Sequence, residues 1–395
     1  MSDRTVPAAP LRLREPEAAA RAHGDLRIAL LAEGLRTGDP VADAAFADLS
    51  ADGAAARRTL AAGLRDGLAS LQEVPDGIAE LLRESEEAVA AADGELLQRG
   101  DVASIAVDPF WSRIALALGS LVHTYSAPAI ARVLIGTGKL TESAGRRLGE
   151  TGLWRTNAIL PGGLLRGAPG YVDTVQVRLL HARVRASAQR RGWDAERWGV
   201  PINQADAART WLDFTVVPFR ALEKVGIVLT EDEERDLYRY WRHLAALLGV
   251  DPRFCADVVD HASAERLLGL LETANDRPDE TAGALVHALL DALATGPLGS
   301  VLPLQGDAVR RLLDALTRLI QGDELADALG LGAEDATPYV PLMAMANAQV
   351  RRWERAGGES WRQALAEHTE YRRGEFAYLP GTQYRDEAVG ESGQA

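Results

Sequence analysis

A histidine flanked by two arginines is the feature of this sequence best suited to chemistry. His181 lies in VQVRLLHARVR, with Arg178 three residues before it and Arg185 four residues after it. On a helix these positions share a face that is otherwise apolar. An imidazole there is desolvated, which favours its neutral form and leaves a nitrogen lone pair for a metal. Haem iron needs such an imidazole and haem propionates need cationic donors, so the trio is suited to haem.

The alternative is a core histidine that bonds a backbone carbonyl, with both arginines extending to solvent. Histidines on buried helix faces are common, and a motif this short is weakly specific. Taken alone, the His181 segment favours this alternative.

A second polar group lies on the face of the segment that begins at Thr141. Arg147 and Thr151 are four residues apart, so they are neighbours on a helix, and Glu150 lies at the edge of the same face. An arginine and a hydroxyl on an apolar face each need a partner. A structural ion pair between Arg147 and Glu150 explains the arginine, and this segment alone favours that interpretation.

Several other chemistries lack their motifs in this sequence. The seven histidines show neither HxxxH nor HxxE spacing, which argues against a zinc hydrolase or a di-iron carboxylate site. There is no Gly-x-Ser-x-Gly elbow, and GTGKL at 136–140 lacks the upstream glycine of a phosphate loop. Cys255 is the only cysteine, which excludes an intramolecular disulfide and a cysteine-rich metal site.

The composition of the chain limits the kinds of binding partner that we expect. The net charge of −14 argues against nonspecific binding to nucleic acid. No uncharged apolar run reaches the length of a membrane span, and the first residues lack the apolar stretch of a secretory signal. We therefore expect a cytoplasmic protein without a membrane span. The sequence does not indicate its oligomeric state.

Almost the whole interior of the chain has helical periodicity. Ala, Leu, Arg and Glu dominate, and apolar residues recur at three- and four-residue spacing. This pattern predicts an all-α single domain over residues 26–379, between a flexible arm at 1–25 and a flexible tail at 380–395. The predicted helices are 56–72, 78–93, 112–136, 142–155, 172–190, 203–223, 230–249, 264–275, 281–294, 307–321 and 338–356.

Several motifs in order resemble one known family. RLGET at 147–151, VQVRLLHARVR at 175–185 and WGVPINQADAARTW at 198–211 are similar to the catalytic domain of latex clearing proteins (rubber oxygenases) and MpaB-like oxygenases. The later GIVLTEDEERDLYRYWRHLAALLGV at 226–250 is similar to the next helix of that family. Three ordered motifs are much more specific than any one of them.

The resemblance implies a globin-like helical core that encloses haem b and oxidises an apolar alkene with O2. His181 is then the proximal iron ligand, and Arg147 and Thr151 are the polar residues near the haem. Arg178 and Arg185 are expected to bind the cofactor. Thr151 is expected to donate a hydrogen bond to bound oxygen, and Glu150 to move a proton if burial raises its pKa.

Two positions depart from the rubber-cleaving members. The residue before the threonine is a lysine in those proteins and Glu150 here, and a carboxylate cannot act as a neutral amine ligand. The stretch around Ala131, AIARVLIG, holds no counterpart of their upstream glutamate. Solid rubber cannot enter a cell, so we expect an intracellular enzyme for a small or medium alkene, plausibly terpenoid.

Two other functions stay open at this point. One is a noncatalytic haem protein that senses O2 or redox state or carries haem, since fold does not fix function. The other is a helical interaction module without a cofactor. Four aromatic residues are candidates for the pocket wall, although aromatic residues at helical spacing are more often plain core. They are Trp154, Trp211, Phe214 and Phe219.

Overall fold

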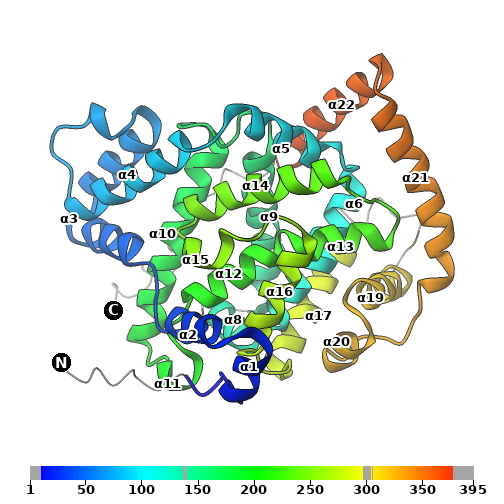
Figure 1. Ribbon diagram of the computed structural model, residues 1–395, viewed down its shortest axis with the longest axis horizontal. Coiled ribbons are helices and arrows are strands. Elements are labelled where there is room, and N and C mark those ends of the chain that lie inside the picture. Colours follow the sequence, from blue (N-terminus) through cyan, green and yellow to red (C-terminus); the bar gives the residue numbers. More distant parts are fainter. Residues whose placement is uncertain (1–9, 137–139, 297–303, 305, 377–395) are drawn as a thin grey trace, which may run out of the picture.

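The protein is built from helices. The computed structural model describes residues 10–136, 140–296, 304 and 306–376, without the side chains of 140–144, and these residues form no strand (Figure 1). In chain order the elements are α1 (Pro16–His23), α2 (Asp25–Gly34), α3 (Pro40–Asp66), η1 (Leu68–Ser70), α4 (Asp76–Ala90), α5 (Gly94–Ala106), α6 (Pro109–Ile114), η2 (Ala115–Leu121), α7 (Val122–Ser126), α8 (Pro128–Ile135), α9 (Leu140–Ile159), α10 (Pro169–Arg190), α11 (Ala195–Trp198), α12 (Gln204–Asp213), α13 (Val216–Lys224), α14 (Glu231–Leu247), α15 (Pro252–Cys255), α16 (His261–Glu272), α17 (Glu280–Thr295), α19 (Asp307–Gln321), α20 (Asp323–Ala328), η3 (Thr337–Tyr339), α21 (Val340–Ala356) and α22 (Glu359–Glu375). The all-α fold class is confirmed.

The predicted helix at 112–136 is divided into shorter pieces. Residues Ala115–Leu121 form a π-helical segment, a conformation that is rare and frequent at functional sites. Pro128 then begins α8 after Ala127, whose backbone is extended (φ −80°, ψ 113°). Proline removes a backbone donor and disfavours helical geometry in the residue before it, so the helix restarts there.

The predicted helix at 203–223 is also interrupted. α12 ends at Asp213, and α13 begins at Val216 after Thr215, which has a non-helical backbone (φ −121°, ψ −90°). Local periodicity continues across this point, so the pattern does not reveal the break. The interruption matters because Phe214, which lies in it, contributes to an internal cavity.

The N-terminal arm is structured from residue 10 onward. α1 occupies Pro16–His23, and Leu13 is buried. Arg12 is also buried, and its guanidinium donates two hydrogen bonds of 2.9 Å to the carboxylate of Asp206. The flexible arm predicted over 1–25 stays a prediction, and from residue 10 onward this segment contains α1 and the contact of Arg12 with Asp206, almost two hundred residues away. The tail predicted at 380–395 lies outside the described residues.

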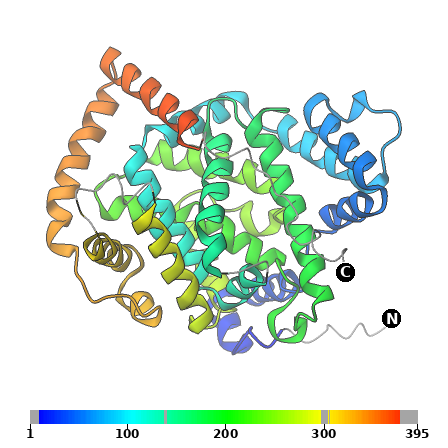
Figure 2. The same ribbon diagram turned by 180° about the vertical axis from the view of Figure 1, so that it is seen from behind.

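Helix α10 is the central element for the residues of interest. It packs against α9 on one side and α3 on another, and it also contacts α14. Figure 2 shows α9 and α10 as two long neighbouring helices, joined by the short segment 160–168 at one end. α21 and α22 lie at the edge of the molecule in Figure 1. α22 contacts α5 and α9, and α21 is held by Asn347, which donates to the carbonyl of Val225, and by Arg351, which donates to Glu233.

No single helix of the described part is long and apolar enough to cross a membrane. The bent pair Gly94–Ala106 and Pro109–Ser126, with an angle of 96° between its halves, meets the criteria of length and composition together.

Candidate functional site

The imidazole of His181 is largely removed from water and has no hydrogen-bond partner among the described residues. Burial, and secondarily the positive charge of Arg185, lowers the pKa of His181 to about 4. The side chain nevertheless keeps some accessible surface. Burial therefore favours the neutral imidazole, whose nitrogens have no hydrogen-bond partner among the described residues.

The alternative of a plain core histidine loses its two main supports. The imidazole has no backbone carbonyl as a partner among the described residues. The flanking arginines do not extend to solvent either, because Arg178 is 4% exposed and Arg185 is 2% exposed. That detail of the alternative is wrong.

The pairing of α9 and α10 brings the expected site residues to one level. The two helices run in opposite directions, and the indole Nε1 of Trp154 donates a 3.1 Å hydrogen bond to Oγ1 of Thr174. Four residues further along α9, the backbone of Ala158 lies against Gly170, where an added Cβ would be 2.6 Å from Cα. Each step of four along α9 thus corresponds to four steps back along α10. Continued in the other direction, this register sets Arg147 opposite His181.

Arg147 points from this helix pair toward α7 and α8. Its Nη2 donates a 2.7 Å hydrogen bond to the carbonyl of Leu134. Burial lowers the pKa of Arg147, and the nearby hydroxyl of Tyr125 opposes this shift. Burial in turn raises the pKa of Tyr125, whose hydroxyl has no hydrogen-bond partner among the described residues. Tyr125 is thus a further polar group here that the sequence did not single out.

The other two expected residues of α9 lie beside Arg147. Glu150 is half-buried, and the ion pair that the structure shows for it is with Arg146, at 3.7 Å. Thr151 is half-buried and its hydroxyl makes no hydrogen bond with the described residues. The catalytic roles expected for these residues stay predictions.

Arg178 and Arg185 have partners within the protein. Arg178 donates to both carboxylate oxygens of Asp39, at 2.6 and 2.9 Å, and to Glu84 at 2.8 Å. Arg185 binds the carboxylate of Asp43 at 2.7 Å and the carbonyl of Ile202 at 2.8 Å. Their observed role is therefore to hold α10 against α3 and α4. The expectation that they bind the cofactor gains no support from these contacts and stays a prediction.

A glycine makes the Arg178 pair possible. Gly249 has a left-handed backbone (φ +71°), and an added Cβ would lie 2.3 Å from both Nε of Arg178 and Oδ2 of Asp39. Glycine alone combines this backbone with so close an approach.

A second histidine pairs with a buried carboxylate and was missed by the sequence analysis. Nδ1 of His123 lies 2.7 Å from Oδ1 of Asp213, which also accepts from Thr124 and Arg209 through Oδ2. A carboxylate behind an imidazole orients the ring and raises its basicity as a ligand. His123 and Asp213 are 90 residues apart, so no local signal could have joined them.

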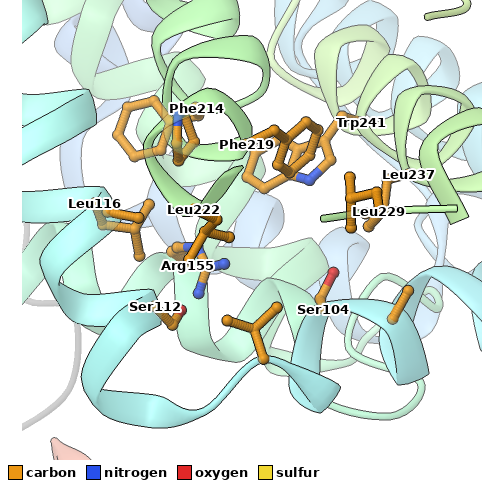
Figure 3. A pocket seen from close by; sticks show the side chains of 14 residues that line it. Ser104, Ser112, Leu116, Arg155, Phe214, Phe219, Leu222, Leu229, Leu237 and Trp241 are labelled. Atoms are coloured by element: carbon orange, nitrogen blue, oxygen red, sulfur yellow. The ribbon is translucent and has the colours of Figure 1, made fainter. Parts of the chain in front are cut away.

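A cavity lies along α9 one turn beyond Thr151 (Figure 3). Its free volume is about 30 Å³, which is room for a few water molecules at most. The walls come from α5, α6, η2, α9, α13 and α14 together with Phe214. Of the aromatic residues proposed for a pocket wall, Phe214 and Phe219 line this cavity. Trp154 instead packs edge-on against Phe214, with 5.4 Å between ring centroids.

The residues around His181 fit the ligation of a haem. No group of three or more His, Cys, Asp or Glu side chains in the described part is arranged to hold a metal ion. A haem iron receives four ligands from its porphyrin and needs only one imidazole from the protein. His181 offers that ligand, because burial favours its neutral form and its ring makes no hydrogen bond with the described residues.

Comparisons with known proteins agree with the motifs. Residues 110–351, more than half of the chain, match the family described as "ER-bound oxygenase mpaB/B'/Rubber oxygenase, catalytic domain". The rubber oxygenase of Streptomyces sp. (strain K30) is 30% identical over 167 residues, which are 41% of this chain and 38% of that protein. The matched part thus spans well under half of that relative.

The fold has a solved counterpart. The structure described as "Latex Clearing Protein LCP in the closed state" superposes with a TM-score of 0.63, covering 88% of this chain and 91% of that chain. The two sequences are 21% identical in this comparison, so the likeness concerns the fold.

Proposed function

This chain belongs to the family of MpaB-type and rubber oxygenase catalytic domains, and from that premise we propose that it is a haem b-dependent oxygenase for an apolar alkene. The single observation that carries the proposal is the state of His181. A buried neutral imidazole without a hydrogen-bond partner among the described residues is costly unless something binds it. Haem iron, bound by this imidazole, would supply that partner.

Each expected site residue of this chain would then have its own role. Bound haem supplies the O2 chemistry, in a core that the resemblance describes as globin-like. His181 would hold the haem through its iron. The hydroxyl of Thr151, which has no partner among the described residues, is free to donate a hydrogen bond to an oxygen-bearing ligand. Arg147, held by the carbonyl of Leu134, keeps a positive charge on the same stretch of α9.

Two replacements distinguish the proton chemistry from that of the rubber-cleaving members. Ala131 on α8 is fully buried and carries no carboxylate where those members have a glutamate. Glu150 stands where they have a lysine, and it lies 3.7 Å from the guanidinium of Arg146. Glu150 is therefore the carboxylate of this site that could hold or move a proton.

The proposed substrate is a small or medium apolar alkene of isoprenoid or terpenoid type, in the cytoplasm. The relative from Streptomyces is named for rubber, and the matched part covers 38% of that protein. Phe214, Phe219 and Trp241 place apolar side chains around the small cavity beside Arg155.

The test of the proposal is haem binding by matched histidine variants. His181→Ala should lose the Soret band, measured per protein after purification with added haem precursor. His243→Ala is the matched control, because burial also lowers the pKa of His243 to about 4 and its Nε2 is likewise unpartnered, but on α14. His243→Ala should keep its haem.

His123→Ala extends this test to the second imidazole. Full haem loading of His181→Ala with loss in His123→Ala would move the ligand to the His123–Asp213 pair. Colourless wild-type protein would contradict the haem proposal itself.

A noncatalytic haem sensor or carrier is the second candidate. It is favoured by the specific replacement of the family's lysine and glutamate by Glu150 and Ala131. Oxygen uptake discriminates the two, since a sensor binds O2 in stoichiometric amount and an enzyme consumes it continuously when alkene is present.

A further inference from the structure

Helix α21 carries its large apolar side chains on the outside of the protein. Leu342, Met345, Val350 and Trp353 are 64%, 60%, 45% and 43% exposed, and Tyr339, directly before the helix, is 65% exposed. Figure 1 shows α21 at the edge of the molecule. Single apolar residues scattered over a surface are normal, whereas a continuous apolar patch marks an interaction site.

The buried residues of α21 are polar. They are Asn347, Arg351 and Glu354. Nδ2 of Asn347 donates a 2.8 Å hydrogen bond to the carbonyl of Val225, and Nη2 of Arg351 lies 2.8 Å from both carboxylate oxygens of Glu233. A surface helix normally turns its apolar side chains to the core and its polar ones to water. α21 has the reverse arrangement, so its apolar face has no partner among the described residues.

The exposed side chains have the spacing of a seam between two helices. Six exposed positions are separated alternately by three and four residues, namely Tyr339, Leu342, Ala346, Gln349, Trp353 and Ala356. We call these six residues the outer seam. Such alternation is the a and d pattern of heptads, in which the seam of one helix is covered by another helix. The outer seam therefore indicates a helix as its partner.

A lipid surface fits the outer seam less well. Gln349 lies near its middle, and a side-chain amide placed in lipid loses its hydrogen bonds to water without replacement. Between two helices, a polar residue in the seam is tolerated and fixes the register of the pair. The net charge of −14 also opposes attraction to an anionic membrane.

The outer seam is complementary to itself when two copies of α21 run antiparallel. Its positions are symmetric about the point between residues 347 and 348, so a two-fold axis there sets each position against another of the six. The contacts, each formed twice, are then Leu342 with Trp353, Ala346 with Gln349, and Tyr339 with Ala356. Tyr339 and Gln349 thus each meet the small side chain of an alanine.

The exposed charge beside the outer seam favours the same orientation. Arg352 is exposed next to Trp353. In an antiparallel pair the two copies of Arg352 lie roughly 13 Å apart along the helix axis, beyond the screening length of about 8 Å. A parallel pair would place them at the same level, where they repel each other.

We propose that the outer seam of α21 joins two copies of this chain as an antiparallel helix pair. The proposal goes beyond the oxygenase function and does not depend on haem. A single helix pair is a small interface, so we expect an equilibrium between monomer and dimer with a dissociation constant in roughly the micromolar range.

Sedimentation equilibrium of the full chain over a wide range of concentrations tests the proposal. Leu342→Glu and Trp353→Arg should each raise the dissociation constant of the dimer at least about a hundredfold, because the dimer contains this contact twice and each copy contributes roughly tenfold. Leu26→Glu is the matched control, since Leu26 is 88% exposed but lies on α2, and it should dimerise like the wild type. Circular dichroism should be the same for all of these proteins, because the replaced side chains are exposed.

A mixture of the two variants tests the antiparallel register. In a dimer of one Leu342→Glu chain and one Trp353→Arg chain, the introduced carboxylate faces the introduced guanidinium, and the second Leu342–Trp353 contact is native. The mixture should therefore dimerise at least about tenfold more tightly than either variant alone. A parallel pair would not bring the two introduced charges together and would give no such rescue.

Several results would overturn the proposal. They are a wild type that stays monomeric at every concentration, a dimer that persists unchanged in both variants, and a mixture that dimerises no better than its components. Phosphatidylcholine vesicles test the lipid alternative, and the wild type should sediment with them no more than Leu342→Glu does. Sedimentation of a monomeric wild type with these vesicles, lost in Leu342→Glu, would assign the outer seam to a lipid surface instead.

Discussion

Buried arginines on the two sides of the α9–α10 pair differ in whether a carboxylate neutralises them. On the side of α10 that packs on α3, Arg178 and Arg185 are buried and neutralised by Asp39, Glu84 and Asp43. On the cavity side of α9, Arg155 is surrounded by apolar side chains and has no carboxylate within ion-pair distance in the described part.

This difference distinguishes buried charges that stabilise the fold from buried charges that are available to a ligand. A buried ion pair that is complete within the protein fixes two helices relative to each other, and removing one member leaves an uncompensated charge. A buried charge left incomplete stabilises nothing in the free protein and is available to a ligand. The same reasoning applies to His181, whose imidazole is unengaged while that of His123 is bonded to Asp213.

The largest change in the free energy of unfolding is expected from breaking the ion pair between Arg178 and Asp39. Arg178→Met should lower the free energy of unfolding by about 3 kcal/mol, because Asp39 then stays buried without its counter-ion. Urea denaturation followed by circular dichroism measures this. Arg65→Met removes an exposed pair with the adjacent Asp66 and should leave the unfolding midpoint in place. A loss below about 1 kcal/mol in Arg178→Met would contradict the structural role.

A smaller loss in the free energy of unfolding is expected when the Arg178–Asp39 pair is displaced but kept. Gly249→Ala combines a left-handed backbone cost of about 1–2 kcal/mol with a clash against Arg178 and Asp39. Gly192 also has a positive φ (+82°), but nothing lies within 4 Å of an added Cβ there. Gly192→Ala therefore measures the backbone cost alone and should be the milder variant. Equal unfolding midpoints for the two would show that the ion pair tolerates displacement.

Replacing Arg155, which has no counter-ion among the described residues, should not lower the free energy of unfolding. Arg155→Met should unfold at a urea concentration equal to or higher than the wild type at neutral pH, because it removes an uncompensated charge. The folded pKa of about 9 lies below the ordinary 12.5, so the folded state releases this proton more readily than the unfolded state. The wild type should therefore gain stability relative to Arg155→Met as pH rises through about 9.

The environment of Arg155 sets the control for this pH series. Arg372, Glu375 and Tyr240 face the same guanidinium and remain in both proteins, so the difference between the two isolates Arg155. A clear loss of stability in Arg155→Met at neutral pH would mean that the charge has a partner after all.

The smallest effect is expected for the pH dependence of haem binding. The pKa of His181 in the cofactor-free protein is about 4, below the ordinary 6.5, so protons compete for the lone pair only in more acidic solution. Haem affinity, followed by Soret titration, should stay nearly constant from about pH 8 to about pH 5. A tenfold fall per pH unit beginning near the ordinary pKa would show that His181 is hydrated.

Local pattern in the sequence predicted much of this molecule. Three- and four-residue periodicity is a property of neighbouring residues, so the all-α class and the helices around His181 and Arg147 could be predicted. The family resemblance, carried by ordered motifs between 147 and 250, is confirmed by the match over 110–351. The breaks at Thr215 and in the π-helical segment were not predicted, because the residues there keep helical periodicity.

The sequence by itself thus determined that the chain is helical, which family it belongs to, and that His181 lies on an apolar helix face. Only the tertiary structure decided which charged groups are neutralised. Asp39 and Arg178 are 139 residues apart, and the wall around Arg155 is drawn from residues between 103 and 241. Ion pairs and cavities arise from packing between distant segments, and the energy of a buried charge depends on what packing brings within a few ångströms.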